Sequence, residues 1–200
     1  MKKIACLCFL CLLLAGCATQ KLPPVTEYAL APKMMSPQQP EQRVALTIKL
    51  SPIVASQTYM TPEFYYVDDS YQRNPYAYSR WVDASVRMLH LVLQDGLEQS
   101  GLFEAVLPPS SILSADLQLE TTLYDFSHHV GTGSSSEAVV RMRFNLVDIR
   151  KGKILGSRQF VSHTPSAGRD AKSGVAAINT SVSEILEKLI SWLAEAASGQ

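Results

Sequence analysis

Side chains that could carry chemistry are few in this 200-residue chain, and they are scattered. The four histidines are His90, His128, His129 and His163, and no pair has the H-x₃-H or HExxH spacing that holds a metal ion. His128 and His129 are neighbours at the end of an expected strand, so their side chains should point to opposite faces. We interpret His128, His129 and His163 as exposed loop residues and place His90 on the flank of an expected helix, and we expect neither a metal nor a cofactor.

A segment rich in glycine and serine, residues 131–136, contains G-x-G but lacks the third glycine and the lysine of a phosphate-binding loop. A strand is expected after it, so no helix N-terminus is available to a phosphate. We therefore expect a hairpin loop. No serine lies in a G-x-S-x-G elbow or has a recognisable histidine and acid beside it. The sequence thus predicts no catalytic residues, and we do not expect an enzyme.

Cysteine usage and charge exclude further classes of function. All four cysteines, Cys6, Cys8, Cys11 and Cys17, lie in the first 17 residues. The remainder can form no disulfide, thiolate metal site or cysteine nucleophile. Residues 1–17 also hold two of the 18 basic residues and no acid, which leaves 16 basic and 18 acidic residues. A weakly acidic chain without a basic run is not expected to bind nucleic acid.

The start of the chain has the pattern of an export signal. Lys2 and Lys3 precede an apolar run of 12 residues, Ile4–Ala15, whereas a membrane-spanning helix needs about 20. The sequence Leu14-Ala15-Gly16-Cys17 then resembles the bacterial lipobox, in which the cysteine thiol receives a diacylglyceryl group. We therefore expect residues 1–16 to be a lipoprotein signal peptide and Cys17 to be the lipidation site, with palmitate among its acyl chains. The alternative is a plain signal peptide with an incidental cysteine.

The predicted lipid anchor also indicates a location. One myristoyl chain binds a membrane only marginally, whereas two or three long chains on one cysteine should hold it permanently. Ala18 stands where the known bacterial retention signal places an aspartate. By resemblance to that sorting rule, we expect the chain in the outer membrane, facing the periplasm.

Residues 17–43 are expected to be a lipidated, proline-rich tether, because prolines punctuate them without apolar periodicity. Fully stretched, the 26 residues that follow Cys17 would reach about 86 Å. A short apolar patch, Tyr28–Pro32, interrupts the tether and could dock on the domain that follows.

Residues 44–200 are predicted to form one domain, which is long enough for a core of its own. Strands are expected at 44–50, 64–67, 103–107, 115–126, 137–149 and 154–163, and amphipathic helices between Asp83 and Gly101 and over 171–196. Residues 68–80 are predicted to be a loop, because Asp68, Asp69, Asn74 and Pro75 are turn formers. The expected fold is α+β, a mostly antiparallel sheet with the two helices packed on one face.

Half of the sixteen aromatic residues fall within residues 59–81. Aromatic side chains among prolines in an irregular segment can form a binding surface, or they can cover the sheet as core. The candidate partner-binding residues are Tyr65, Tyr66, Tyr76, Tyr78, Arg80 and Trp81.

The order of these motifs resembles the ABC-type transport auxiliary lipoproteins, which include the lipoprotein of the paraquat-inducible operon and those that accompany MCE-family lipid transporters. After the lipobox, the matching motifs are Tyr28-Ala29-Leu30-Ala31-Pro32, the strand from Val44 to Pro52, Arg80-Trp81, Leu102–Val106, the strand from Ala115 to Asp125-Phe126, and a closing helix ending near Trp192. Segment 53–80 departs from the family pattern, since it is longer and richer in tyrosine and proline.

The resemblance implies a non-enzymatic, membrane-anchored periplasmic component of an MCE-type ABC transport system that moves lipids or other hydrophobic molecules across the envelope. Its implied partner is the MCE-domain protein, and the chain is expected to form a homo-oligomer. The alternative is a structural envelope lipoprotein in cell-wall or secretion assembly.

Overall fold

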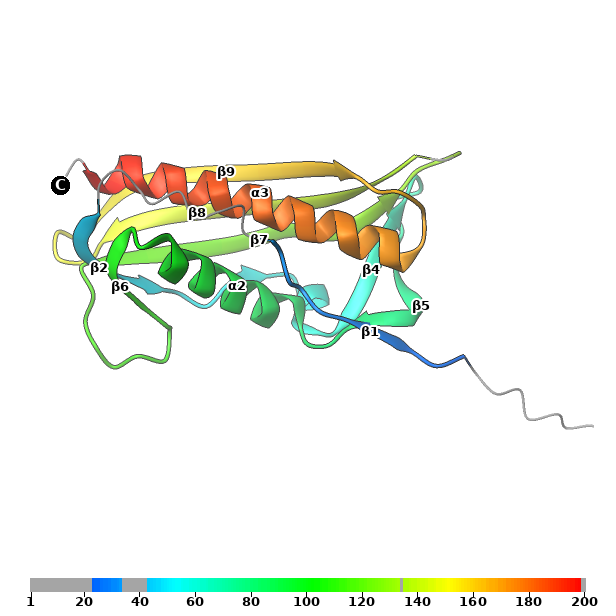
Figure 1. Cartoon of the computed structure of the whole chain (residues 1–200), viewed down its shortest axis with the longest axis horizontal. Helices are drawn as coiled ribbons and strands as arrows, with labels where there is room; N and C mark the ends of the chain where they lie inside the picture. The colour runs from blue at the N-terminus through cyan, green and yellow to red at the C-terminus, as the bar shows by residue number, and fades with distance from the viewer. Residues whose placement is uncertain (1–22, 34–42, 134, 199–200) are drawn as a thin grey trace, which may run out of the picture.

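A computed structural model describes residues 23–33, 43–133 and 135–198, and within them a single mixed sheet lies under two long helices (Figure 1). The strands are β1 (Thr26–Tyr28), β2 (Val44–Leu50), β3 (Val54–Ala55), β4 (Glu63–Asp68), β5 (Arg73–Trp81), β6 (Phe103–Leu107), β7 (Leu117–Val130), β8 (Ser136–Asp148) and β9 (Lys153–Pro165). The helices are α2 (Ser85–Ser100) and α3 (Ala171–Ser198), and η1 (Gln57–Met60) is a single 3₁₀ turn.

Strand β7 is the strand around which the sheet is built. One side of it pairs with β8 along its whole length, and β8 pairs in turn with β9. The other side is shared by three strands in succession: β2 at residues 117–119, β3 at 122–123 and β4 at 128–130. The sheet therefore forks along this side of β7, with β2 and β6 on one branch and β4, β5 and β1 on the other.

The α+β class and the two helices on one face are confirmed, but the expectation of a mostly antiparallel sheet is wrong (Figure 1). Five of the eight strand pairings are parallel. The hairpin loop expected at 131–136 joins β7 to β8, and β9 continues the same antiparallel meander. The parallel pairings of β7 join segments that lie far apart in the sequence, and alternation within one strand does not reveal its partner.

The predicted loop at 68–80 is also wrong, since most of it forms β5. The turn formers act over a shorter stretch, where Asp68 Oδ1 accepts the N–H groups of Ser70 and Gln72 at 2.9 and 3.1 Å. Pro75 lies within β5 opposite Tyr65. A strand tolerates proline where one of its edges is open, and β1 pairs with β5 only over Ser79–Trp81 in the described part of the chain.

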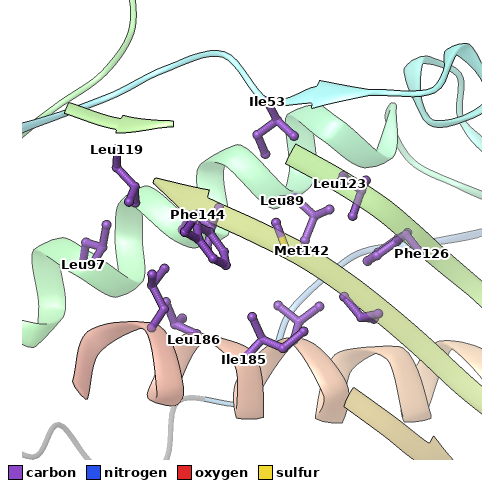
Figure 2. Packing of buried hydrophobic residues seen from close by; sticks show 14 of the residues in the cluster. Ile53, Leu89, Leu97, Leu119, Leu123, Phe126, Met142, Phe144, Ile185 and Leu186 are labelled. Carbon is purple, nitrogen blue, oxygen red and sulfur yellow. The ribbon is translucent and has the colours of Figure 1, made fainter. Parts of the chain in front are cut away.

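Both helices bury the apolar stripes that the sequence predicts (Figure 2). Leu89, Leu93 and Leu97 of α2 and Ile185 of α3 are buried between the helices and the sheet. Helix α2 ends at Gly101, whose φ of 63° is left-handed and therefore suits a glycine. The start of α2 differs from the expectation, because its N-cap position is Ala84.

The aromatic cluster divides between core and surface. Trp81 is only 1% exposed, and its ring centroid lies 4.9 Å from that of Phe64 and 5.5 Å from that of Phe126. Tyr59 is buried as well. At the other end of the sheet Trp192 packs edge-on against Phe160. The rings of Phe64, Trp81 and Phe126 fill the core at the branch of the sheet that carries β4 and β5.

Residues 26–33 lie against the domain. β1 pairs in parallel with β5, the N–H of Ala31 donates to Asn179 Oδ1 at 2.7 Å, and Ser183 Oγ donates to the carbonyl oxygen of Lys33 at 3.0 Å. The docking predicted for the patch at 28–32 is thus confirmed, and the folded unit extends N-terminally of residue 44. Among the described residues, neither helix is long and apolar enough to cross a bilayer.

The packing of Trp81 predicts a large loss of stability on truncation. Trp81→Ala should lower the free energy of unfolding by about 3–5 kcal/mol, because it leaves a cavity between Phe64 and Phe126. Urea denaturation measures this, with Ile154→Ala as the exposed control. A loss no larger than that of the control, together with lost partner binding, would instead make Trp81 an interface residue.

Candidate functional site

A groove with a volume of about 540 Å³ lies where β5 meets the start of α3. We call it the tyrosine groove. Its lining residues are Tyr66, Pro75, Tyr76, Ala77, Tyr78, Ser79, Val130, Arg169, Asp170 and Ala171. Three chain segments build it: β4 with β5, the end of β7, and the connection from β9 into α3. It is therefore a surface that only the folded domain presents.

The structure brings together three of the six predicted partner-binding residues, namely Tyr66, Tyr76 and Tyr78. Tyr65 is half-buried and does not line the groove. Arg80 is exposed and forms an ion pair with Glu27 of β1 at 2.5 Å. Trp81 belongs to the core. Cys17 lies outside the described residues, so its lipidation stays a prediction.

Tyr76 forms the fixed wall of the groove. Its ring lies 5.0 Å from both Phe64 and Tyr66, and its hydroxyl lies 2.7 Å from His128 Nδ1 and donates to the carbonyl oxygen of Arg169 at 3.1 Å. Burial, and then the nearby charge of Asp170, raise the pKa of the Tyr76 hydroxyl above its usual range. The Tyr76 side chain is therefore neutral, and it is held both at its ring and at its hydroxyl.

His128 is buried in β7, so its interpretation as an exposed loop residue is wrong. The loop interpretation is also wrong for His129 and His163, which lie in β7 and β9. Its Nε2 lies 2.8 Å from Ser166 Oγ, and the hydroxyls of Ser166 and Ser136 both reach the carbonyl oxygen of Gly168 at 2.9 Å. A Cβ atom on Gly174 of α3 would lie 2.6 Å from His128 Nδ1, so only glycine admits the imidazole at that position. His128 thus connects the sheet to the chain segment that enters α3.

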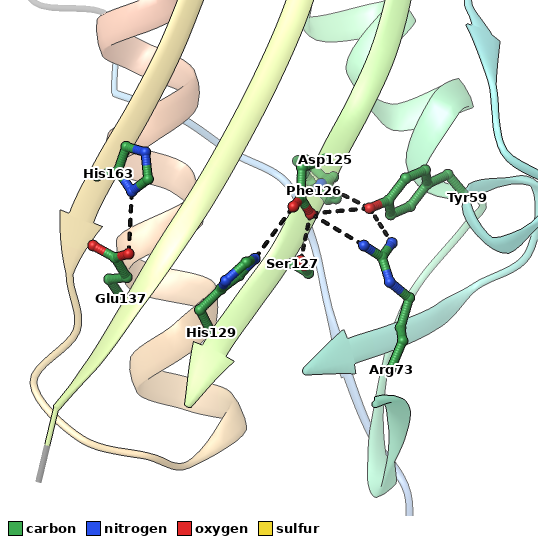
Figure 3. Close-up of polar contacts among 8 residues, drawn as sticks. All are labelled: Tyr59, Arg73, Asp125, Phe126, Ser127, His129, Glu137 and His163. Carbon is green, nitrogen blue, oxygen red and sulfur yellow. Dashed lines mark hydrogen bonds and ion pairs between the residues drawn. The ribbon is translucent and has the colours of Figure 1, made fainter. Parts of the chain in front are cut away.

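A second polar group, the Asp125 cluster, lies in the fork of the sheet between β3 and β4 (Figure 3). Tyr59 Oη donates to Asp125 Oδ1 at 3.1 Å and accepts from Arg73 Nη1 and from the N–H of Phe126, the latter at 3.0 Å. His129 Nε2 lies 3.2 Å from Asp125 Oδ2. His128 and His129 therefore point to opposite faces of β7, as the sequence predicts.

Electrostatics keep Asp125 charged. Burial acts to raise the pKa of its carboxyl, but hydrogen bonds from His129 and Ser127 and the charge of Arg73 lower it overall. Burial also raises the pKa of Tyr59 to about 12. Ser127 donates to this carboxylate and not to an imidazole, so the cluster lacks the order of a nucleophilic triad. Its groups hold one another and the backbone of β7.

Sequence reasoning missed part of the groove. Val130 and residues 169–171 carry no local signal of binding, because only the fold places them beside β5. His128 was considered, but its sequence neighbours give no sign of Tyr76 or Ser166. Across residues 23–33, 43–133 and 135–198, no three His, Asp or Glu side chains are grouped so as to hold a metal ion.

Comparison with known sequences decides the family. A sequence model described as "ABC-type transport auxiliary lipoprotein component" matches residues 28–189, which is most of the chain. The chain belongs to this family. The match confirms the resemblance drawn from the motifs, and it spans the tyrosine groove and the Asp125 cluster. Among curated proteins, none matches this auxiliary lipoprotein in sequence.

Solved structures share the fold. The protein XCC0632 from Xanthomonas campestris superposes with a TM-score of 0.79 at 19% identity, covering 88% of this chain and 98% of its own. An uncharacterized protein superposes with a TM-score of 0.66 at 13% identity, covering 86% of this chain and 99% of its own. The hypothetical protein CT253 from Chlamydia trachomatis superposes with a TM-score of 0.57 at 7% identity, covering 78% of this chain and 99% of its own. At such identities the likeness shows the fold alone.

From the hydrogen bonds of the Asp125 cluster, we expect the Tyr59 hydroxyl to contribute to the stability of the fold. Tyr59→Phe should lower the free energy of unfolding by about 1–3 kcal/mol, because it leaves the buried Phe126 N–H unpaired and removes one of the hydrogen bonds to the Asp125 carboxylate. Tyr124→Phe, at an exposed position of β7, is the matched control for urea denaturation. Equal effects of the two substitutions would contradict this role.

His128 predicts loss of stability in mild acid. Burial lowers the pKa of His128 in the folded state below the unfolded-state value of about 6.5. The contribution of the neutral, buried imidazole to the free energy of unfolding is therefore complete above about pH 6.5 and is lost as the pH falls below that value. The urea midpoint should therefore decrease between about pH 6.5 and 5. His128→Gln should flatten that decrease, whereas His163→Gln, at an exposed site, should not. An unchanged slope in His128→Gln would assign the effect elsewhere.

Proposed function

We propose that this chain is a non-enzymatic lipoprotein, anchored through Cys17 in the outer membrane and facing the periplasm, that serves an MCE-type ABC transport system. In this role it binds the MCE-domain protein of a system that moves lipids or other hydrophobic molecules across the envelope. The observation that carries the proposal is the family match over residues 28–189, which includes a preformed aromatic groove.

The anchor and the location rest on the sequence. Leu14-Ala15-Gly16-Cys17 has the order that lipidation needs, and Ala18 is not the aspartate of the retention signal. Family membership adds that the chain is an auxiliary lipoprotein of ABC transport. The MCE partnership goes one step further and rests on the order of the motifs along the chain.

The tyrosine groove has the composition of a protein-binding surface. Aromatic residues and arginine are enriched at binding hot spots, and a side chain that is already fixed loses little entropy on binding. Tyr76 is held by ring contacts and by two hydrogen bonds of its hydroxyl, Tyr78 is 47% exposed, and Arg169 is an exposed residue of the lining. The groove therefore offers one rigid and one accessible ring to a partner.

The edge of β5 offers a second means of recognition beside the groove. In the described part of the chain, residues 73–75 of β5 pair with β4 on one side, and residues 73–78 have no strand on the other side, because β1 begins opposite Ser79. An extended peptide can add to such an edge through main-chain hydrogen bonds, with its side chains entering adjacent pockets. A segment of the MCE-domain protein bound in this way would place a side chain in the tyrosine groove.

The polar groups support a non-enzymatic role. Asp125, Tyr59 and Arg73 satisfy one another within the fork of the sheet. His128 is engaged on both ring nitrogens, by Tyr76 and Ser166. Their geometry serves to hold strands and helix together, so these groups are already used by the fold.

Crosslinking and mass spectrometry of the tagged lipoprotein, extracted from membranes, test this function. An MCE-domain protein should be the main crosslinked partner, and Cys17→Ala should lose both lipid labelling and membrane retention. If cell-wall or secretion components dominate instead, the chain is a structural envelope lipoprotein and the transport role is wrong.

Tyr78 provides the residue-level test. Tyr78→Ala should weaken binding to the crosslinked partner about tenfold, the effect of losing roughly 1.4 kcal/mol at a hot spot, while thermal stability changes little because the ring is exposed. Tyr124→Ala removes a similarly exposed tyrosine from another part of the surface and should leave binding unchanged. Equal affinities for the two variants would remove the groove from the interface.

A further inference from the structure

The connection between β6 and β7 presents two aliphatic side chains to water. We call residues 108–114 the aliphatic loop. Ile112 is 99% exposed and Leu113 is 61% exposed. No charged residue lies between Glu104 and Asp116. Two adjacent, exposed aliphatic residues in a loop without charge are unusual on a soluble surface and mark a site of interaction.

The aliphatic loop is held in a defined position. Lys49 Nζ donates to the carbonyl oxygen of Ser111 at 2.7 Å, and the N–H of Ser111 donates to the carbonyl oxygen of Pro108 at 3.1 Å. At the base of the loop, Asp116 and Thr47 exchange two hydrogen bonds of 2.9 and 3.0 Å. The strands therefore hold the loop so that Ile112 and Leu113 project outward.

The docking of β1 limits the distance between the domain and the lipid anchor at Cys17. Only residues 18–25 separate Cys17 from β1, and a chain of that length spans at most about 30 Å. The N-terminal residues 23–25 and the aliphatic loop leave the molecule on the same long side, at its opposite ends (Figure 1). A bilayer that holds the anchor at one end therefore faces the loop at the other.

We propose that the aliphatic loop inserts Ile112 and Leu113 into the same bilayer that holds Cys17, so that the domain lies with this long side along the membrane. This inference rests on the proposed lipidation of Cys17. Two aliphatic side chains are too weak to bind a membrane alone, since even a myristoyl chain binds only marginally. The anchor makes their insertion an intramolecular step, which raises their effective concentration at the surface.

The chemistry of this side favours lipid over a charged partner. The loop is a projection without charge, aromatic ring or arginine, whereas protein hot spots are enriched in aromatic residues and arginine. Helix α2, on the same long side, carries the exposed acids Asp95 and Glu98, which oppose adsorption to an anionic surface. Insertion should therefore be apolar and insensitive to salt.

The test uses the lipidated protein reconstituted into phosphatidylcholine vesicles. Residues 18–200 contain no cysteine, so Ile112→Cys introduces a unique thiol for an environment-sensitive fluorophore. Ile154→Cys is the matched control, because Ile154 is also an exposed isoleucine, 60% exposed on β9. The fluorophore at 112 should shift to the blue and be quenched by brominated lipids, and Leu113→Ser should reduce that quenching. The fluorophore at 154 should remain aqueous.

Each result decides the proposal. If the protein floats with the vesicles but the fluorophore at 112 stays as aqueous as the one at 154, the proposed loop insertion is wrong. The lipid anchor is then unaffected by that result. Protein that does not float overturns the anchor, and the insertion that depends on it falls as well. Quenching that disappears at high salt indicates electrostatic adsorption and also overturns the proposal.

Discussion

The buried carboxylate of Asp125 lies where the sheet forks, and the placement of the branch that carries β4 and β5 depends on it. A carboxylate loses much hydration free energy on burial, so its partners must stay in place. Those partners come from η1, β5 and β7 itself, through Tyr59, Arg73 and His129. Because β4 meets β7 over only three residue pairs, the cluster fixes the branch that carries β4 and β5.

The tyrosine groove inherits its geometry from this branch and from the segment that enters α3. Tyr76 belongs to β5, and it reaches His128 of β7 and the backbone at Arg169. The groove is thus assembled before any partner arrives, which lowers the entropic cost of binding. A change at His128 or Gly174 would alter the shape of the groove although neither residue lines it.

Local patterns were sufficient for the helices and the meander, because helical periodicity and strand alternation are properties of a single segment. They failed where the deciding contact is distant: Pro75 reads as a loop signal until the open edge of β5 is known, and the parallel partners of β7 leave no mark on its own alternation. The candidate site was found in part for the same reason. Its tyrosines form a cluster in sequence, whereas Arg169 and His128 come from elsewhere in the chain.

The attachment of β1 also determines how the domain responds to mechanical load. A pull on the N-terminus acts first on three residue pairs between β1 and β5, and then on the hydrogen bonds that Asn179 and Ser183 make to residues 31–33. Tyr28 and Leu30 also pack against the core, so releasing this segment uncovers part of its edge. Releasing residues 26–33 frees eight residues of chain, which extend to about 26 Å. The docked segment is therefore a reserve of length, which lets the domain follow a change in the spacing of its surroundings.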